Sequence, residues 1–253
     1  LVAQSYGKSN YNEIVSIVLR NLIIAVVMGI VIIILYYPII SAVSIFFEIS
    51  KETLNLIEDY IFLRVFSAPA ELIIYVFAGF YLGLQKTKIS SFLIGIFCFA
   101  NIFLSIFFVN YVGMDVKGVA LGTLISSYFT VILFTFYSNF FVIKNFKVVP
   151  RLKKGLFKSK LLKLVSINFD IFLRTILLTF AFLWMNYLSS KLGEDYLAAN
   201  SILYQFLIIS SFFLDAYAFS CEGIIGYSVG NNSKKSFMST VRNCFELSFY
   251  TGL

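Results

Sequence analysis

The sequence of 253 residues contains no histidine, which excludes a zinc site built on imidazole and a Ser-His-Asp catalytic triad. Cysteine is scarce: Cys98, Cys221 and Cys244 lie in separate apolar segments without a paired spacing, which argues against a disulfide or metal role. The sequence has no glycine-rich Walker loop, so it carries no motif for using ATP by itself. We therefore expect no enzyme, no cofactor and no metal site.

Charged residues are also few, at 13%, whereas hydrophobic residues make up 60% and the mean hydropathy is +0.90. Water-soluble domains carry about 25% charged residues, so this composition is typical of a chain surrounded by lipid. Runs of about 20 apolar residues are long enough to cross a bilayer as helices. They predict an all-α membrane protein with spans near 20–42, 65–84, 89–110, 119–143, 165–188 and 199–225, and a seventh that begins near Phe237.

Basic residues are distributed unequally between alternate loops. One set of loops carries 15 of the 20 basic residues and a single acid, Glu13, whereas the other set carries three lysines and seven acids. Because Lys and Arg accumulate in cytoplasmic loops, the first set is predicted to be cytoplasmic. Its longest member, 144–164, is predicted to be a basic linker between two helix bundles. The net charge of +7 comes without a nucleic-acid-binding module, so we expect contact with the lipid bilayer and none with nucleic acid.

Four ionisable residues interrupt two of the apolar segments: Asp170 and Arg174 in one, Asp215 and Glu222 in the next. A charge at the bilayer centre costs about 2.5 to 3.5 kcal/mol on insertion scales, so such residues are rarely kept without a role. Residues four or seven apart share a helix face. Two interpretations stay open: a structural pair or hydrogen bond, or groups that line a cavity and bind a proton or a cationic substrate.

Two weaker patterns lie nearer the start of the chain. Arg64 and Glu71 are interpreted as a local interfacial pair, and Gly79 with Gly83 forms a GxxxG pattern that predicts close helix packing. In addition, residues 3–7 resemble residues 226–230, at an offset of 223. Parallel repeats build some transporters from two similar bundles. The offset predicts a parent of six plus six helices, of which this chain is a part.

Several motifs resemble the multidrug and toxic compound extrusion (MATE) family, within the branch named for the DNA-damage-inducible F protein. The resemblance covers essentially the whole chain and is strongest in 168–175, 197–200 and 214–218. It implies a fold of two six-helix lobes, of which this partial chain holds helices 3 to 8 and part of helix 9. Residues 1–143 would form part of the N-lobe (helices 3 to 6) and residues 165–253 part of the C-lobe (helices 7, 8 and the start of 9).

The resemblance also implies a function and a set of residues. It implies a multi-pass protein of the inner (plasma) membrane, acting as a monomer, that exports amphipathic or cationic compounds in exchange for H⁺ or Na⁺ by alternating access. The family's N-lobe proton site matches Asn101 and Thr123, but its acidic residue is replaced here by Ser105. We therefore expect ion or substrate linkage at Asn101 and Thr123 and at the C-lobe set Asp170, Arg174, Asp215 and Glu222.

Two alternatives stay open. The first is a truncated, non-transporting remnant of such a transporter, to which the replacement at Ser105 and the partial length point. The second is a lipid-linked oligosaccharide flippase of the same superfamily. A flippase for an anionic substrate should place cationic residues inside the N-lobe, and we expect none deep in those helices.

Overall fold

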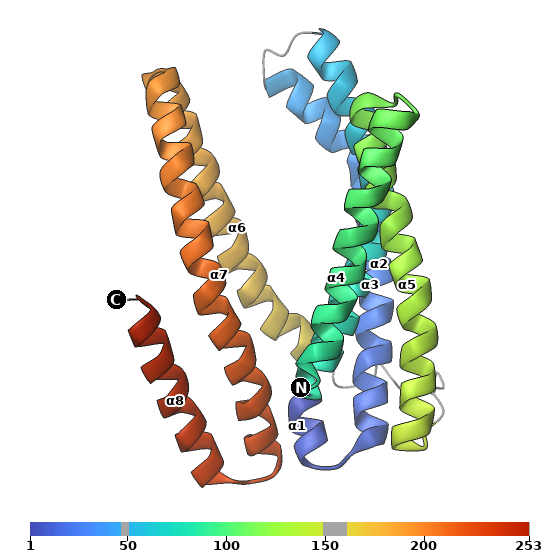
Figure 1. Cartoon of the computed structure of the whole chain (residues 1–253), viewed down its shortest axis with the longest axis vertical. Helices are drawn as coiled ribbons and strands as arrows, with labels where there is room; N and C mark the ends of the chain where they lie inside the picture. Colours follow the sequence, from blue (N-terminus) through green and yellow to red (C-terminus); the bar gives the residue numbers. More distant parts are fainter. Residues whose placement is uncertain (47–50, 149–160, 253) are drawn as a thin grey trace. The chain divides into compact units, whose positions relative to one another are not determined.

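The computed structural model describes residues 1–46, 51–148 and 161–252, and its regular secondary structure there is entirely helical. The elements are α1 (Val2–Gly7), α2 (Tyr11–Phe46), α3 (Lys51–Gly83), α4 (Thr87–Ile106), the π-helical turn η1 (Phe107–Tyr111), α5 (Asp115–Phe146), α6 (Leu161–Leu192), α7 (Glu194–Gly230) and α8 (Lys234–Gly252) (Figure 1).

Six of the described helices are long and apolar enough to cross a membrane, which confirms the predicted all-α membrane fold. They lie at Tyr11–Ser41, Leu54–Gly83, Thr87–Tyr111, Asp115–Phe146, Phe169–Leu192 and Glu194–Gly230. Most are longer than predicted, because the helices continue past the apolar runs into polar flanks. The predicted seventh span is helical as α8, but it is not among the six, since charged residues such as Arg242 and Glu246 interrupt its apolar residues.

Helices also occupy two regions that were predicted to be polar connections. The polar opening of the chain contains α1, a short helix that the hydropathy pattern did not predict. The predicted linker 144–164 is helical at both ends, because α5 continues to Phe146 and α6 begins at Leu161. Residues 149–160 of that linker lie outside the described residues. A helix boundary depends on capping and packing, so a change in polarity alone does not place it.

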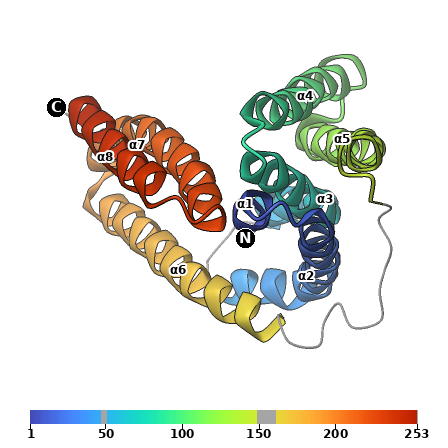
Figure 2. The same cartoon turned by 90° about the horizontal axis from the view of Figure 1, so that it is seen from below.

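The chain divides into two compact units. Unit 1 comprises Leu1–Leu152 and Gly223–Lys234, and unit 2 comprises Lys153–Glu222 and Lys235–Leu253. The predicted lobe boundaries stay a prediction. In unit 1, α3 packs against α2, α4 and α5, and Figure 2 shows these helices side by side. Figure 1 shows α2 and α3 bending together where α2 finishes and α3 begins.

The core of unit 1 lies between α3 and α5 and is centred on Tyr81. This side chain is fully buried, and its hydroxyl hydrogen bonds with the Ser138 hydroxyl across 2.8 Å. The Tyr81 ring also lies 5.8 Å from the ring of Phe141 and 6.4 Å from that of Phe134. Aromatic packing of this kind adds about 0.5 to 1.5 kcal/mol per pair beyond burial. The core therefore fixes α3 and α5 next to each other.

In unit 2, the helices α6 and α7 form an antiparallel hairpin. Gly193 joins them with φ +125°, a conformation that glycine adopts without strain. Across the hairpin the Asn200 amide donates a hydrogen bond to the Ser189 hydroxyl, and the rings of Phe182 and Tyr204 lie 4.7 Å apart. These contacts align the two helices that carry the predicted C-lobe residues.

Candidate functional site

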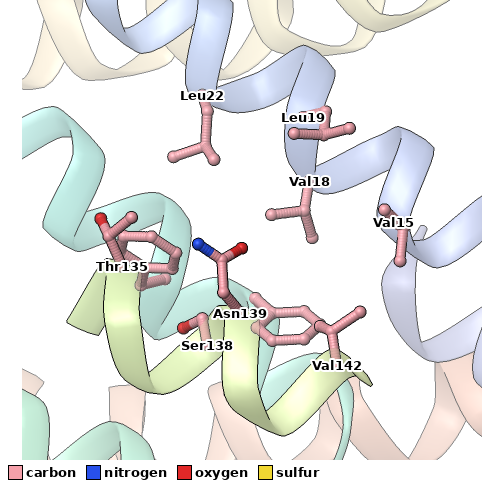
Figure 3. Close-up of a pocket in the computed structure, with 10 residues that line it drawn as sticks. Val15, Val18, Leu19, Leu22, Thr135, Ser138, Asn139 and Val142 are labelled. Carbon is pink, nitrogen blue, oxygen red and sulfur yellow. The ribbon is translucent and has the colours of Figure 1, made fainter. Parts of the chain in front are cut away.

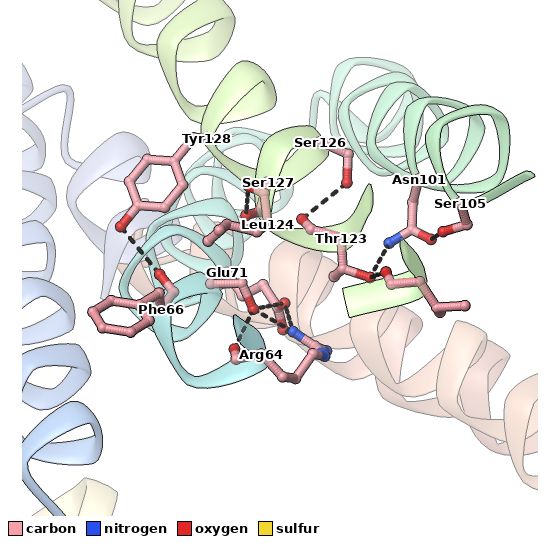
Figure 4. Close-up of polar contacts among 12 residues, drawn as sticks. Arg64, Phe66, Glu71, Asn101, Ser105, Thr123, Leu124, Ser126, Ser127 and Tyr128 are labelled. Carbon is pink, nitrogen blue, oxygen red and sulfur yellow. Dashed lines mark hydrogen bonds and ion pairs between the residues drawn. The ribbon is translucent and has the colours of Figure 1, made fainter. Parts of the chain in front are cut away.

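Asn101 and Thr123, the two predicted residues of the N-lobe, lie in contact between α4 and α5 (Figure 4). The Asn101 side-chain amide donates to the Thr123 hydroxyl at 2.8 Å, and the Ser105 hydroxyl donates to the Asn101 side-chain amide oxygen Oδ1 at 3.4 Å. Gly122 permits this approach, because a Cβ there would lie 2.8 Å from the Ser105 hydroxyl oxygen. Within the described residues these three side chains form a neutral hydrogen-bonded cluster without a carboxylate.

A second polar cluster lies on α3 and joins Arg64, Ser67 and Glu71 (Figure 4). The Arg64 guanidinium donates to both carboxylate oxygens of Glu71, and the Ser67 hydroxyl lies 2.8 Å from the nearer of those oxygens. The predicted pair is therefore confirmed. It is not confined to a membrane interface, however, because Glu71 lies 12 residues before Gly83, or about 18 Å along the helix.

Two arginines of unit 1 lie within candidate spans, and the expectation of no cation deep in the N-lobe helices stays a prediction. Arg64 lies ten residues inside the span that begins at Leu54, and Arg20 lies nine residues inside the span that begins at Tyr11. Arg20 is only 4% exposed, and its guanidinium donates to the Ser16 carbonyl oxygen at 3.1 Å. The sequence analysis placed Arg20 at the start of the predicted span 20–42 and Arg64 just before the predicted span 65–84.

The four predicted C-lobe residues lie on α6 and α7. Asp170 and Arg174 are exposed on α6, and Asp215 and Glu222 are exposed on α7. Among the hydrogen bonds and ion pairs of residues 161–252, none involves any of the four. The structure therefore does not pair Asp170 with Arg174, although helical spacing allows it. Their ion or substrate linkage stays a prediction.

Two hollows open in unit 1. The first, between α2 and α5 above α3, has a volume of about 60 Å³, and Figure 3 shows Asn139 and Ser138 facing Val18 and Leu22 across it. The second, of about 350 Å³, lies between α4 and α5 and is lined by Lys88 and apolar side chains. Pockets for drug-sized ligands measure about 300 to 1,000 Å³, so the first is too small for a cargo molecule. Neither hollow is lined by an acidic residue.

The two copies of the predicted repeat pack directly against each other. A Cβ on Gly7 would lie 2.3 Å from the Tyr227 carbonyl oxygen, and a Cβ on Gly230 would lie 2.1 Å from the Gln4 carbonyl oxygen. With the offset of 223, Gln4 corresponds to Tyr227 and Gly7 to Gly230, so the contact is reciprocal. The turns that follow also correspond, since Ser9 has φ 54° and its equivalent Asn232 has φ 52°. Such reciprocity is the signature of a two-fold contact.

The GxxxG prediction holds at one glycine only. A Cβ on Gly83 would lie 2.8 Å from the Val2 side chain, so close packing at Gly83 is confirmed. Nothing lies within 4 Å of a Cβ on Gly79, so the same prediction is wrong there. The close approaches elsewhere in unit 1 use Gly7, Gly29, Gly122, Gly226 and Gly230.

A family model, MatE, matches residues 1–107 and 171–253. The chain belongs to the MatE family. The matched residues include both copies of the repeat and the cluster of Arg64, Ser67 and Glu71. They also include three of the four predicted C-lobe residues, Arg174, Asp215 and Glu222. The match confirms the resemblance stated from the motifs.

Curated relatives of this MatE chain include DNA damage-inducible protein F of Escherichia coli (strain K12), 29% identical over 230 residues. That alignment covers 91% of this chain and 50% of the relative. Protein DETOXIFICATION 43 of Arabidopsis thaliana is 27% identical over 199 residues, covering 77% of this chain and 36% of the relative. The chain thus spans half or less of the curated relatives it matches.

Solved structures show the same fold. An outward-facing multidrug resistance MATE family transporter of the MOP superfamily matches with a TM-score of 0.88 at 17% identity, covering 99% of this chain and 55% of the other. A MOP superfamily transporter from Pyrococcus furiosus, described by the reverse polarity of its binding pocket, matches with a TM-score of 0.87 at 17% identity, with coverages of 99% and 55%. These likenesses confirm a MATE-type fold.

Proposed function

We propose that this chain is part of an efflux antiporter that exports amphipathic or cationic compounds in exchange for H⁺ or Na⁺ by alternating access. The observation that carries the proposal is the reciprocal contact between the two copies of the repeat. Two copies of a repeat that pack through equivalent residues are expected in a transporter built from two similar bundles, a design that alternating access uses. A multidrug resistance transporter with the same fold supports the choice of cargo.

The glycines explain why this contact can separate and re-form. Gly7 and Gly230 place backbone against backbone, and among the described residues no ion pair joins the two copies. A contact made by backbone surfaces and small residues is held by packing, without charges whose separation would be costly in lipid. On the predicted topology it lies at the cytoplasmic side, where it would close the pathway when the cargo site faces outward.

The experiment is an efflux assay with the full open reading frame that encodes this chain. Cells that express it are loaded with ethidium, and the rate of fluorescence loss is followed with and without a proton or sodium gradient. We expect gradient-dependent efflux that is lost in Asp170→Asn and in Arg174→Ala, while membrane insertion is preserved. Normal efflux in both variants would show that the C-lobe pair has no part in transport.

The two alternatives give different results in the same assay. A non-transporting remnant shows no efflux, whatever the gradient. A lipid-linked oligosaccharide flippase shows no ethidium efflux but changes lipid-linked sugar export. The pairing of Arg64 with Glu71 argues against the flippase, because it neutralises that charge, whereas the buried Arg20 donates only to the Ser16 carbonyl oxygen.

A further inference from the structure

Glu71 has a special position among the acidic residues of unit 1. Within residues 1–46 and 51–148, it is the one acid more than five positions from the nearer end of a candidate span. The cluster of Asn101, Ser105 and Thr123 contains no carboxylate. If a carboxylate of unit 1 binds an ion within the membrane, the described residues therefore offer Glu71 for that role.

Oxygen atoms of α5 lie level with this carboxylate. Three contacts set the register of α3 against α5: Asp59 with Lys117, Phe66 with Tyr128, and Tyr81 with Ser138, at sequence separations of 58, 62 and 57. The mean of these separations, 59, places Glu71 about level with Thr130, and Ser67 about level with Ser126 and its neighbour Ser127. These three α5 side chains are fully buried.

The hydroxyls of this stripe can act only as acceptors toward α3. Ser126, Ser127 and Thr130 donate their protons to carbonyl oxygens of their own helix, at 3.0, 2.8 and 2.7 Å. Their lone pairs stay available, because a hydroxyl has one proton and two acceptor sites. The Ser67 hydroxyl and the Glu71 carboxylate add acceptor oxygens at about the same level of the neighbouring helix α3. Such an environment favours a cation.

Arg64 is the cation that now occupies the carboxylate, and it reaches Glu71 along α3 past Pro69, which lies inside the helix. Pro69 lies between them and cannot donate a backbone hydrogen bond to the Val65 carbonyl. Nearby carbonyls take side-chain donors instead: Ser67 donates to the Arg64 carbonyl at 2.7 Å, and Tyr128 donates to the Phe66 carbonyl at 3.1 Å. The proline therefore leaves one backbone acceptor of α3 without its helical donor close to the Arg64 to Glu71 pair.

We propose that Glu71 binds a small monovalent cation, H⁺ or Na⁺, and that the Arg64 guanidinium is a tethered competitor that occupies the carboxylate when the ion is absent. For H⁺, a hydronium ion transfers its proton to a Glu71 oxygen and leaves as water, so one O–H bond breaks and one forms, and the hydrogen bonds from Arg64 to that carboxylate break. For Na⁺, the carboxylate and the Ser67 hydroxyl supply oxygen ligands. When Glu71 is protonated, the Arg64 guanidinium still donates a hydrogen bond to the Ser67 hydroxyl. The role of this cation site in coupled transport rests on the proposed antiport.

Few other charged groups face this site. On α3 itself, Tyr60 lies one turn before Arg64 and interacts with it. From α5, Tyr128 is engaged with the Phe66 carbonyl, and Lys117 is paired with Asp59 at 2.9 Å, 12 residues along α3 from Glu71. From α2, the uncharged Gly29 packs against Pro69. The response of Glu71 to cations is therefore set chiefly by Arg64.

The test measures cation binding in the absence of any gradient, so it does not depend on transport. The full chain is purified in nanodiscs, and its unfolding temperature is followed in NaCl against choline chloride at equal ionic strength, and across pH 8 to 5 in choline chloride. A ligand that binds only the folded state raises stability as its concentration passes the dissociation constant. The sodium series and the pH series identify which ion binds.

We expect Glu71→Gln to abolish the rise in unfolding temperature that the cation produces. In Arg64→Gln the midpoint of this rise should lie at a cation concentration lower by about tenfold or more, because the guanidinium that competes for the carboxylate is gone. Arg64→Lys, which keeps the charge without the two-pronged geometry, should move it in the same direction by less. Asp59→Asn is the matched control: it removes a carboxylate from an exposed ion pair on the same helix and should leave the midpoint unchanged.

Two results would overturn the assignment: a wild-type cation response in Glu71→Gln, or an unmoved midpoint in both Arg64 variants. The second outcome would make the pair a structural clasp across Pro69. If the purified chain shows the expected cation response but cells that express it show no ethidium efflux, the proposed antiport is refuted and the assignment of the cation site is not.

Discussion

The reciprocal contact of the repeat leads to a prediction about its two glycines. In Gly230→Ala the new Cβ would lie 2.1 Å from the Gln4 carbonyl oxygen, and in Gly7→Ala it would lie 2.3 Å from the Tyr227 carbonyl oxygen. Real Cβ contacts are essentially never under 3.0 Å, and a backbone carbonyl cannot rotate away as a flexible side chain can. The helices must therefore move apart.

The expected cost is that of overpacking, about 1 to 3 kcal/mol or more for each substitution. Each kcal/mol corresponds to about 2 to 4 °C for a chain of this size, so either variant should unfold roughly 2 to 12 °C below the wild type. The double variant should cost less than the sum of the two, because both substitutions separate the same pair of helices. The assay is thermal unfolding in nanodiscs, followed by circular dichroism.

Two other glycines provide matched controls. Nothing lies within 4 Å of a Cβ built on Gly79 or Gly95, and both lie inside helices. Gly79→Ala and Gly95→Ala should therefore be neutral or stabilise the chain by about 0.5 to 1 kcal/mol. If Gly230→Ala unfolds at the same temperature as Gly95→Ala, the two copies of the repeat do not pack as described, and the argument for alternating access loses its main support.

Other residues lead to three further predictions. Tyr81→Phe should lower the free energy of unfolding by about 1 kcal/mol, because it removes the buried bond to Ser138; an unchanged unfolding midpoint would refute that role. Asn101→Ala should cost about 0.6 to 1.7 kcal/mol in the same assay, the range of interhelical hydrogen bonds in membranes, whereas Asn145→Ala, whose amide bonds only to its own helix at Phe141, should cost less. Asp170→Asn and Arg174→Ala should abolish ethidium efflux without loss of membrane insertion, whereas Asp59→Asn should retain it; efflux equal in all three would contradict the C-lobe assignment.

Much of the site could be predicted from motifs, but its contacts could not. Asn101 and Thr123 were named from family motifs, and the structure brings them within 2.8 Å across two helices. The role of Ser67 was not predicted, because an isolated serine in an apolar span gives no signal until its neighbours on the helix face are known. Glu71 was interpreted as interfacial because it lies near the start of the predicted span 65–84 with Arg64 seven residues before it, although the candidate span continues on both sides.

The sequence by itself determined that this is an α-helical membrane protein with a repeated architecture. Hydropathy is a local property of each segment, so spans can be read without knowing where any helix packs. Tertiary structure decided which glycines matter and which polar groups meet. A Cβ on Gly230 would clash with Gln4 whereas a Cβ on Gly79 would meet nothing, and Glu71 meets Arg64 along α3 past Pro69. Those outcomes depend on the rotation and crossing of each helix, which arise only when neighbouring helices pack together.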